Sequence, residues 1–233
     1  MTLSLGGIGR AAIDLLYPPR CAICGRGGDF LCRACRDALP AADGLRCDVC
    51  WQPVRQGASC RACTDHPLAL SRVRCAYRYE GEVRRLVRAF KFGGQSSLAA
   101  SLAAPMGDVW RQQGFDADLI VPVPLLHRRE RERGYNQSLL LARELSKATG
   151  APVSEALSRL HSRAHQAESA GAEERWANVK GAFAVALPGL VAGKRVAVVD
   201  DITTTGATLD ACARALIDGG ADEVLGLTLA RED

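Results

Sequence analysis

The chain has 233 residues, of which 48% are hydrophobic and 24% charged, so it can bury a core and is not a disordered protein. Its ten cysteines are too sparse for a small secreted disulfide scaffold, and nine of them fall between Cys21 and Cys75. The net charge of +4 resides in the same region, because residues 1–75 hold ten arginines and six acidic residues. The sequence therefore predicts a small cysteine-rich module followed by a conventional globular domain.

The N-terminal segment, residues 1–19, has neither a basic leader nor a small-residue cleavage site of the secretory type. Its aliphatic residues are interrupted by Arg10 and Asp14, and no stretch of the chain approaches the roughly 20 consecutive apolar residues that a membrane helix requires. We expect a cytoplasmic protein without an integral membrane segment. The segment itself is expected to be a short amphipathic helix that docks on the second domain or lies on a membrane surface.

Four successive Cys-x-x-Cys pairs, separated by seven, eleven and nine residues, dominate residues 20–75. Such a pair on a tight turn aims both thiolates at one ion, and two pairs complete the tetrahedral four-sulfur shell that zinc prefers. Disulfides, a thioredoxin-like redox pair and an iron–sulfur cluster fit the repeated spacing less well. We predict two closed structural Zn²⁺ sites and favour pairing in sequence order over an interleaved order, which the spacing also permits. The ligands would then be Cys21, Cys24, Cys32 and Cys35 at one site and Cys47, Cys50, Cys60 and Cys63 at the other.

From residue 76 onward, apolar periodicity alternates between helices and buried strands. Helices are expected at residues 80–92, 98–110, 136–149 and 208–217, and strands at residues 118–124, near Val153, and at residues 182–185, 195–199 and 224–229. This alternation is typical of an α/β fold with a mostly parallel sheet and helices on both faces. Ligands of such sheets bind where strand ends meet helix starts.

The segment from Val196 to Thr208 carries the strongest functional signal. A buried strand ends at two adjacent carboxylates, Asp200 and Asp201, and hydroxyl residues with Gly206 lead directly into a helix. The backbone amides of the turn, its threonine hydroxyls and the positive end of the helix together predict a phosphate site. The carboxylates suit sugar hydroxyls or a magnesium-bearing ligand, so a phosphorylated ribose fits both features. A threonine-rich helix cap with two exposed aspartates is the alternative.

The stretch Val198-Val-Asp-Asp-Ile-Thr-Thr-Thr-Gly-Ala-Thr208 resembles the phosphoribosyl pyrophosphate (PRPP) motif of type I phosphoribosyltransferases. Together with the cysteine array, other segments resemble the ComF family of amidophosphoribosyltransferase-like competence proteins. They are Phe90-Lys-Phe92, Val121-Pro-Val-Pro124, Arg133-Gly-Tyr-Asn-Gln137 and Asn178-Val-Lys-Gly-Ala-Phe183. The resemblance covers essentially the whole chain. It implies a double zinc ribbon in residues 20–75 and a type I phosphoribosyltransferase domain in residues 76–233.

The resemblance also implies roles for individual residues. Asp200 and Asp201 would hold the ribose hydroxyls of PRPP, and Arg128 or Arg129 would act on its pyrophosphate, although the alternating charges of residues 127–133 equally fit a solvated helix start. Gln166 and Arg175 match a mobile loop that covers the reacting centre. The remaining PRPP contacts would come from Thr203, Thr204, Thr205, Gly206, Ala207 and Thr208 around the 5-phosphate and from Leu125, Leu126 and His127 around the pyrophosphate.

As an enzyme, a protein of this kind would displace pyrophosphate from the anomeric carbon of Mg²⁺-bound PRPP, through an oxocarbenium-like transition state, in favour of an acceptor that the sequence does not identify. Two other functions stay open. The family resemblance implies an accessory role in the uptake of single-stranded DNA, with a competence helicase as a further partner. A PRPP sensor that binds without turnover is the third possibility.

Overall fold

The computed structural model describes residues 18–56, 59–160 and 171–232. The chain divides into two compact units, Met1–Leu39 and Pro40–Asp233. The amphipathic helix expected at residues 1–19 lies outside the described residues except for its last two positions. Among the described residues, no helix has the length and apolar character needed to cross a membrane.

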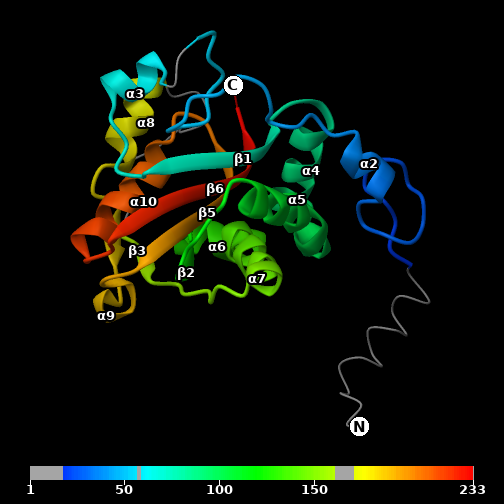
Figure 1. The fold of residues 1–233 in the computed structure, drawn as a ribbon. Helices are drawn as coiled ribbons and strands as arrows, with labels where there is room; N and C mark the ends of the chain where they lie inside the picture. The colour runs from blue at the N-terminus through cyan, green and yellow to red at the C-terminus, as the bar shows by residue number, and fades with distance from the viewer. Residues whose placement is uncertain (1–17, 57–58, 161–170, 233) are drawn as a thin grey trace. The chain divides into compact units, whose positions relative to one another are not determined.

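The larger unit is built on a four-stranded sheet in which every pair of neighbouring strands is parallel (Figure 1). The strands follow the order β1 (Arg72–Arg78), β6 (Glu223–Arg231), β5 (Arg195–Thr203) and β2 (Leu119–Pro122). Their residues are almost all buried, as expected for strands covered on both faces. Because the strands are parallel, their carboxyl ends lie at one edge of the sheet, and this edge carries the site described below.

Helices cover both faces of this sheet, which confirms the predicted α/β fold. Helices α5 (Ala99–Gln112) and α7 (Gln137–Thr149) pack on one face, and α10 (Ala207–Asp218) packs on the other. The antiparallel hairpin of β3 (Leu157–Arg159) and β4 (Phe183–Val185) packs against α10. Val153, expected in a strand, forms an isolated parallel bridge with Ile120, and β1 and β3 are strands that the sequence did not reveal.

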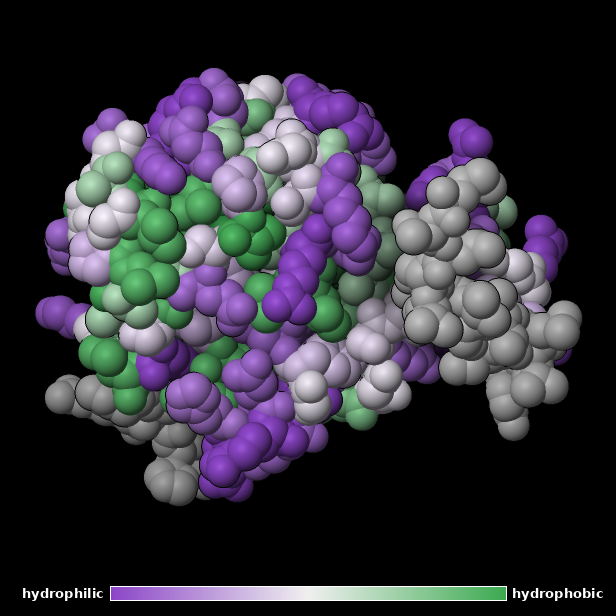
Figure 2. Space-filling model, turned by 90° about the horizontal axis from the view of Figure 1, so that it is seen from below, coloured by the Kyte–Doolittle hydropathy of each residue, from purple (hydrophilic) through white to green (hydrophobic). Residues whose placement is uncertain are grey.

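The remaining helices are short or lie outside the two main layers. In chain order they are α2 (Arg33–Asp37), α3 (Arg61–Asp65), α4 (Gly81–Phe92), the 3₁₀ turn η1 (Ser96–Leu98), α6 (His127–Arg133), α8 (Ala172–Val179) and α9 (Pro188–Val191). Near α9 the side chains of Leu187 and Leu190 are exposed, as is that of Ile217 on α10. Figure 2, which views the molecule from below, shows hydrophobic residues gathered on the side where α9 lies.

The segment after the second cysteine cluster packs closely on the sheet at Gly226 of β6. A side chain added at Gly226 would meet Leu70 at 3.0 Å and Val73 at 3.1 Å. Both of these residues are buried, so the missing side chain makes room for the entry of the chain into β1. The second cluster is therefore attached to the same hydrophobic core as the sheet.

The eight cysteines of the Cys-x-x-Cys pairs form two groups of four. Cys21, Cys24, Cys32 and Cys35 form one group, and Cys47, Cys50, Cys60 and Cys63 form the other, with all sulfur atoms of a group within 4.8 Å of one another. The grouping confirms the pairing in sequence order. Sulfur separations of 3.8 Å (Cys24–Cys32 and Cys47–Cys63) and 3.4 Å (Cys50–Cys60) are close to the roughly 3.8 Å edge of a tetrahedron built on Zn–S bonds of about 2.3 Å. The donor set and its spacing fit Zn²⁺.

The electrostatics of the clusters also favour a bound cation. Burial raises the pKa of the Cys21 thiol, but backbone N–H groups, that of Cys24 first, outweigh it and lower the pKa to about 6. Hydrogen bonding with Cys32 and burial raise the pKa of Cys35 to about 12. Within one cluster, therefore, some thiols lose a proton readily, whereas others lose it only against the repulsion of neighbouring thiolates. A divalent metal removes this conflict because it stabilises all four thiolates together.

We predict that the purified protein carries two Zn²⁺ per chain, as measured by inductively coupled plasma mass spectrometry. The double substitution Cys21→Ser and Cys24→Ser should lower this ratio to one, because each closed cluster loses its ion when two of its four thiolates are removed. Cys212→Ser, which changes a buried cysteine outside the clusters, serves as the control and should leave two ions. Retention of two ions by the Cys21/Cys24 variant would show that the clusters are not independent sites.

Candidate functional site

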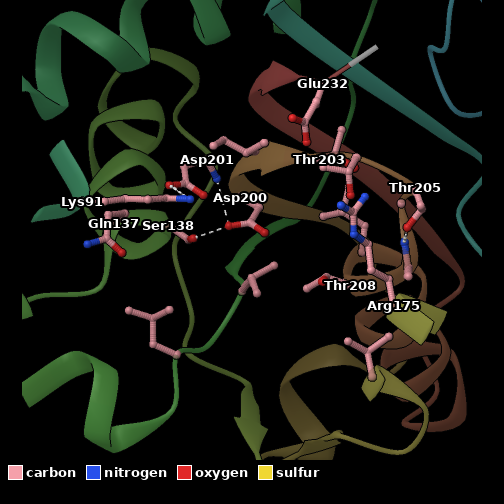
Figure 3. Close-up of a pocket in the computed structure, with 18 of the residues that line it drawn as sticks. Lys91, Gln137, Ser138, Arg175, Asp200, Asp201, Thr203, Thr205, Thr208 and Glu232 are labelled. Carbon is pink, nitrogen blue, oxygen red and sulfur yellow. Dashed lines mark hydrogen bonds and ion pairs between the residues drawn. The ribbon is translucent and has the colours of Figure 1, made fainter. Parts of the chain in front are cut away.

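A cavity of about 420 Å³ opens at the carboxyl ends of the four parallel strands. Each strand contributes to its wall: Tyr79 follows β1, Val123 follows β2, Asp200 belongs to the end of β5, and Glu232 follows β6. Figure 3 shows the acidic pair near the middle of the cavity, with Lys91 on one side and Thr205 on the other. The fold therefore brings the predicted acidic and hydroxyl residues together in one cavity.

One end of the cavity is the turn between β5 and α10. Gly206 is the N-cap of α10 and has a φ of +85°, a left-handed conformation that favours glycine. The backbone N–H of Ala207 donates to the hydroxyl of Thr205 at 3.3 Å. All residues that the sequence assigned to a phosphate contact in this turn line the cavity, namely Thr203, Thr204, Thr205, Gly206, Ala207 and Thr208. Backbone amides and a positive helix end are thus presented to the same space.

The acidic pair forms the middle of the cavity. Asp200 accepts hydrogen bonds at one carboxylate oxygen from the Ser138 hydroxyl (2.8 Å) and from the backbone N–H of Asp201 (2.9 Å). Burial and the neighbouring charge of Asp201 nevertheless raise the pKa of Asp200 to about 7. The side chain of Asp201, buried, is paired with the ammonium of Lys91 at 3.0 Å. The pair is thus held by the Lys91 ammonium at Asp201, and by one hydroxyl donor from α7 and one backbone donor of β5 at Asp200.

Lys91 and Ser138 line the cavity and contact the acidic pair, which the sequence did not reveal. Lys91 lies near the end of α4, where the Tyr135 hydroxyl donates to the carbonyl of Phe90. Ser138 is in the first turn of α7, which begins because the Asn136 side chain accepts from the N–H groups of Ser138 and Leu139. Lys91 belongs to the motif Phe90-Lys-Phe92, and Ser138 directly follows the motif Arg133-Gly-Tyr-Asn-Gln137, so the family resemblance is the one signal that could have directed attention to them.

Cations outnumber acids on the cavity wall. The cationic side chains are Lys91, Arg129, Arg133, Arg159 and Arg175, and the acidic ones are Asp200, Asp201 and Glu232. Burial lowers the pKa of both Arg133 and Arg159, and the buried Nε of Arg159 has no hydrogen-bond partner among the described residues. Arg133 donates to Gln137 at 2.9 Å and lies 4.8 Å from the ring of Phe92. An anionic ligand would supply the counter-charge that these side chains lack.

The structure separates the residues that the sequence assigned to the pyrophosphate. Leu125, Leu126 and Arg129 line the cavity, whereas His127 and Arg128 are not among its lining residues. Arg128 is exposed and donates to Glu132 at 2.8 Å, one turn along α6, as in a solvated helix with alternating charges. Of the two residues assigned to the mobile loop, Arg175 on α8 lines the cavity and Gln166 lies outside the described residues.

Comparison with known proteins gives relatives along nearly the whole chain. Residues 12–64 match the double zinc ribbon domain family. A DNA utilization protein YhgH of Salmonella typhimurium is 33% identical over 222 residues, covering 86% of this chain and 96% of the relative. Competence protein ComFC of Bacillus subtilis is 28% identical and covers 86% and 84%, and competence protein F of Haemophilus influenzae is 28% identical and covers 87% and 97%.

Two solved structures share part of the fold. One is described as the allosteric regulatory enzyme of purine biosynthesis, with 24% identity, a TM-score of 0.39, and coverage of 57% of this chain and 26% of that one. The other is the glutamine PRPP amidotransferase of B. subtilis, with 24% identity, a TM-score of 0.38, and coverage of 56% and 26%. The parallel sheet itself establishes the fold class, and the sequence relatives establish the family. With two four-cysteine clusters, a four-stranded parallel sheet and a relative one-third identical over almost its full length, the chain belongs to the ComF family of competence and DNA utilization proteins.

Proposed function

We propose that the chain binds PRPP with Mg²⁺ and transfers its phosphoribosyl group to an acceptor, with release of pyrophosphate. One observation carries the proposal: an acidic pair, Asp200 and Asp201, and a hydroxyl-lined turn before α10 face the same cavity from consecutive positions of one chain segment. A sugar phosphate carries ring hydroxyls and a phosphate in one molecule, so a single ligand would contact both the acidic pair and the turn. The surplus of cations on the wall supports a ligand with further negative charge.

Each part of the ligand has a matching part of the cavity. The 5-phosphate would accept from the amides and hydroxyls of the turn from Thr203 to Thr208, and the ribose hydroxyls would donate to Asp200 and Asp201. The pyrophosphate would lie toward Lys91, on the other side of the acidic pair from the turn, and toward Arg129 and Arg133, which line a neighbouring hollow together with Lys91. Bound Mg²⁺ would neutralise the charge of the leaving pyrophosphate.

The chain's own residues then act on the reacting sugar by position and charge. As the bond between the anomeric carbon and pyrophosphate breaks, positive charge develops on the ring, and the carboxylate of Asp200 stabilises it. Lys91 and the arginines of the cavity wall, among them Arg175 on α8, receive the departing pyrophosphate. The acceptor forms the new bond at the anomeric carbon, and its proton leaves with solvent or pyrophosphate.

A second candidate function, handling of single-stranded DNA, is favoured by an adjoining surface that shares three cations with the cavity. Phe92 is 66% exposed beside a hollow of about 480 Å³ that it lines with Lys91, Arg129 and Arg133. An exposed aromatic ring beside cations is the arrangement with which proteins stack bases and hold a phosphate backbone. Relatives carry the names DNA utilization protein and competence protein. The three cations line both cavities, so PRPP and DNA would compete.

The test of the main proposal is the double substitution Asp200→Asn and Asp201→Asn. We expect it to weaken PRPP binding at least about tenfold, as measured by calorimetry with Mg²⁺, and to abolish pyrophosphate release with every acceptor that supports turnover in the wild type, because the ribose loses both charged acceptors. The zinc content should stay at two ions per chain. Asp108→Asn, an exposed carboxylate outside the cavity, is the matched control. Residual turnover equal to that of the control would refute the proposal.

We expect Asp200 by itself to lower the stability of the fold while it supports PRPP binding. Its pKa of about 7 lies above the ordinary value, so the unfolded chain loses a proton between about pH 4 and 7 that the folded chain keeps, and stability falls as the pH rises through this window. We expect Asp200→Asn, which keeps the acceptor for Ser138, to raise the melting temperature by about 2–8 °C at pH 8, at about 2–4 °C per kcal/mol, and to leave it unchanged near pH 4. PRPP affinity should fall in the same variant.

Thermal unfolding at the two pH values, followed by circular dichroism, measures this effect. A melting temperature at pH 8 equal to or below that of the wild type would mean that Asp200 is not held at a cost to stability. The expected opposite signs, more stable but weaker in binding, separate a site residue from a structural one.

For the DNA candidate, Phe92→Ala should weaken binding of a labelled oligo-dT about five- to hundredfold at low salt, because one base loses its stacking partner. Leu45→Ala removes another exposed hydrophobic side chain, 70% exposed, and serves as the control. Fluorescence anisotropy over a salt series measures both the affinity and its electrostatic part. Absent affinity at low salt, or affinity that does not change with salt, would remove this candidate.

A further inference from the structure

The segment His66–Leu70 connects the second cysteine cluster to two walls of the cavity. It begins three residues after Cys63, the last ligand of that cluster, and ends two residues before β1. We propose that the second cluster, through this segment, is a positioning element of the phosphoribosyl site: it holds the turn before α10 and the helix that carries Arg175. The inference rests on the proposed function for its ligand, PRPP, but the contacts that carry it belong to the protein alone.

The first contact is with the turn before α10. Leu68 lies against Gly206, where an added side chain would meet it at 3.7 Å. The backbone N–H of Ala69 donates to a carboxylate oxygen of Asp210 at 2.7 Å, and Asp210, in the first turn of α10, is only 3% exposed. A buried carboxylate committed to a backbone donor fixes both partners, because water cannot replace either of them. The segment therefore sets the position of the helix end that faces the phosphate.

Arg214 closes this contact from the helix side. Its Nε donates to the second carboxylate oxygen of Asp210 at 2.7 Å, and its guanidinium also donates to the carbonyl of Pro67 at 3.0 Å. Asp210 and Arg214 thus form a bridge between α10 and the segment. The bridge has partners at both ends, so α10 cannot shift relative to the segment without breaking charge-assisted hydrogen bonds.

The second contact is with α8. The imidazole of His66 stacks on the indole of Trp176, with ring centroids 5.0 Å apart and planes at 16°, and its Nε2 lies 3.2 Å from the Glu173 carboxylate. On the same helix, Arg175 and Asn178 line the cavity. A helix of eight residues has little stability of its own and takes its position from its neighbours. His66 is therefore placed to orient Arg175 by holding the residue next to it.

The cluster can transmit position because it is itself fixed to the sheet. Arg231 of β6 is 2% exposed and donates to the carbonyl of Cys50 at 2.8 Å, and Arg74 of β1 donates to the carbonyl of Asp48 at 2.8 Å. Trp51 lies under the guanidinium of Arg74 at 4.3 Å. The other half of the cluster, Cys60 and Cys63, belongs to α3, a five-residue helix that is joined to these anchors through the shared metal site. Loss of the ion would release α3 and, with it, His66.

The experiment compares the two clusters. Cys60→Ser with Cys63→Ser should remove one zinc and weaken PRPP binding about 10- to 100-fold in calorimetry with Mg²⁺, because small displacements of a binding group are costly. Cys32→Ser with Cys35→Ser removes one zinc from the cluster in the unit Met1–Leu39 and should change PRPP affinity less than about twofold. Equal effects of the two variants would overturn the inference.

A milder variant guards against failure of the cysteine variant to fold. His66→Ala should keep two zinc ions and its melting temperature but bind PRPP about three- to tenfold more weakly, because the stacked pair with Trp176 is lost. Leu187→Ala, which removes an exposed side chain outside the cavity lining, is the control. In the cycle with Trp176→Ala, the double variant should be no weaker than either single variant. Additive losses would contradict a shared role.

Hydrogen exchange supplies a readout that does not depend on PRPP. In His66→Ala, amides of α8 and of the first turn of α10 should exchange faster, while those of β5 and β6 stay unchanged. Unchanged exchange in α8 would overturn the inference. If the wild-type protein does not bind PRPP at all, the proposed function fails, whereas faster exchange of α8 in His66→Ala and in Cys60→Ser with Cys63→Ser would still establish that the second cluster holds α8 through His66.

Discussion

Two adjacent carboxylates at the end of a buried strand are the interaction on which the cavity depends. Asp200 and Asp201 repel each other and are partly or wholly removed from water, so the fold must compensate them from outside β5. Lys91 reaches Asp201 from α4, and Ser138 reaches Asp200 from α7. These contacts tie both helices to the end of β5, in addition to the packing of their buried apolar residues.

The same constraint explains the distribution of charge around the cavity. Lys91 balances only one carboxylate, and burial lowers the pKa of Arg133 and Arg159, which means that the folded state holds charges that it does not fully pair. Such an arrangement is costly in the absence of a ligand. A ligand with hydroxyls at one point and phosphates at others would relieve the cost on both signs of charge. The unpaired charges therefore indicate the kind of ligand more specifically than the shape of the cavity does.

The parts of the site that are local in sequence were predictable. A strand, two carboxylates, a glycine that permits a positive φ and a helix start lie within thirteen residues, and each has a local signature. Lys91 and Ser138 reach the cavity only through the packing of α4 and α7, which the sequence pattern does not encode. Strand β1 was missed because Arg74 sits in its middle. Arg74 can be buried because its guanidinium donates to Gln113 and to the carbonyl of Asp48 and lies over the ring of Trp51. Tertiary structure brings these partners to it, so the local sequence does not indicate them.

The two cysteine clusters have the same ligands but different surroundings. The first belongs to the unit Met1–Leu39, whereas the second is hydrogen-bonded to β1 and β6 and continues into the core through Leu70. A closed four-sulfur site offers no open position for chemistry, so its contribution must be mechanical. For the second cluster, we propose that this contribution falls on the turn before α10 and on Arg175. A structural metal can thus belong to a functional site without touching its ligand, because the segment it holds carries the wall of the cavity.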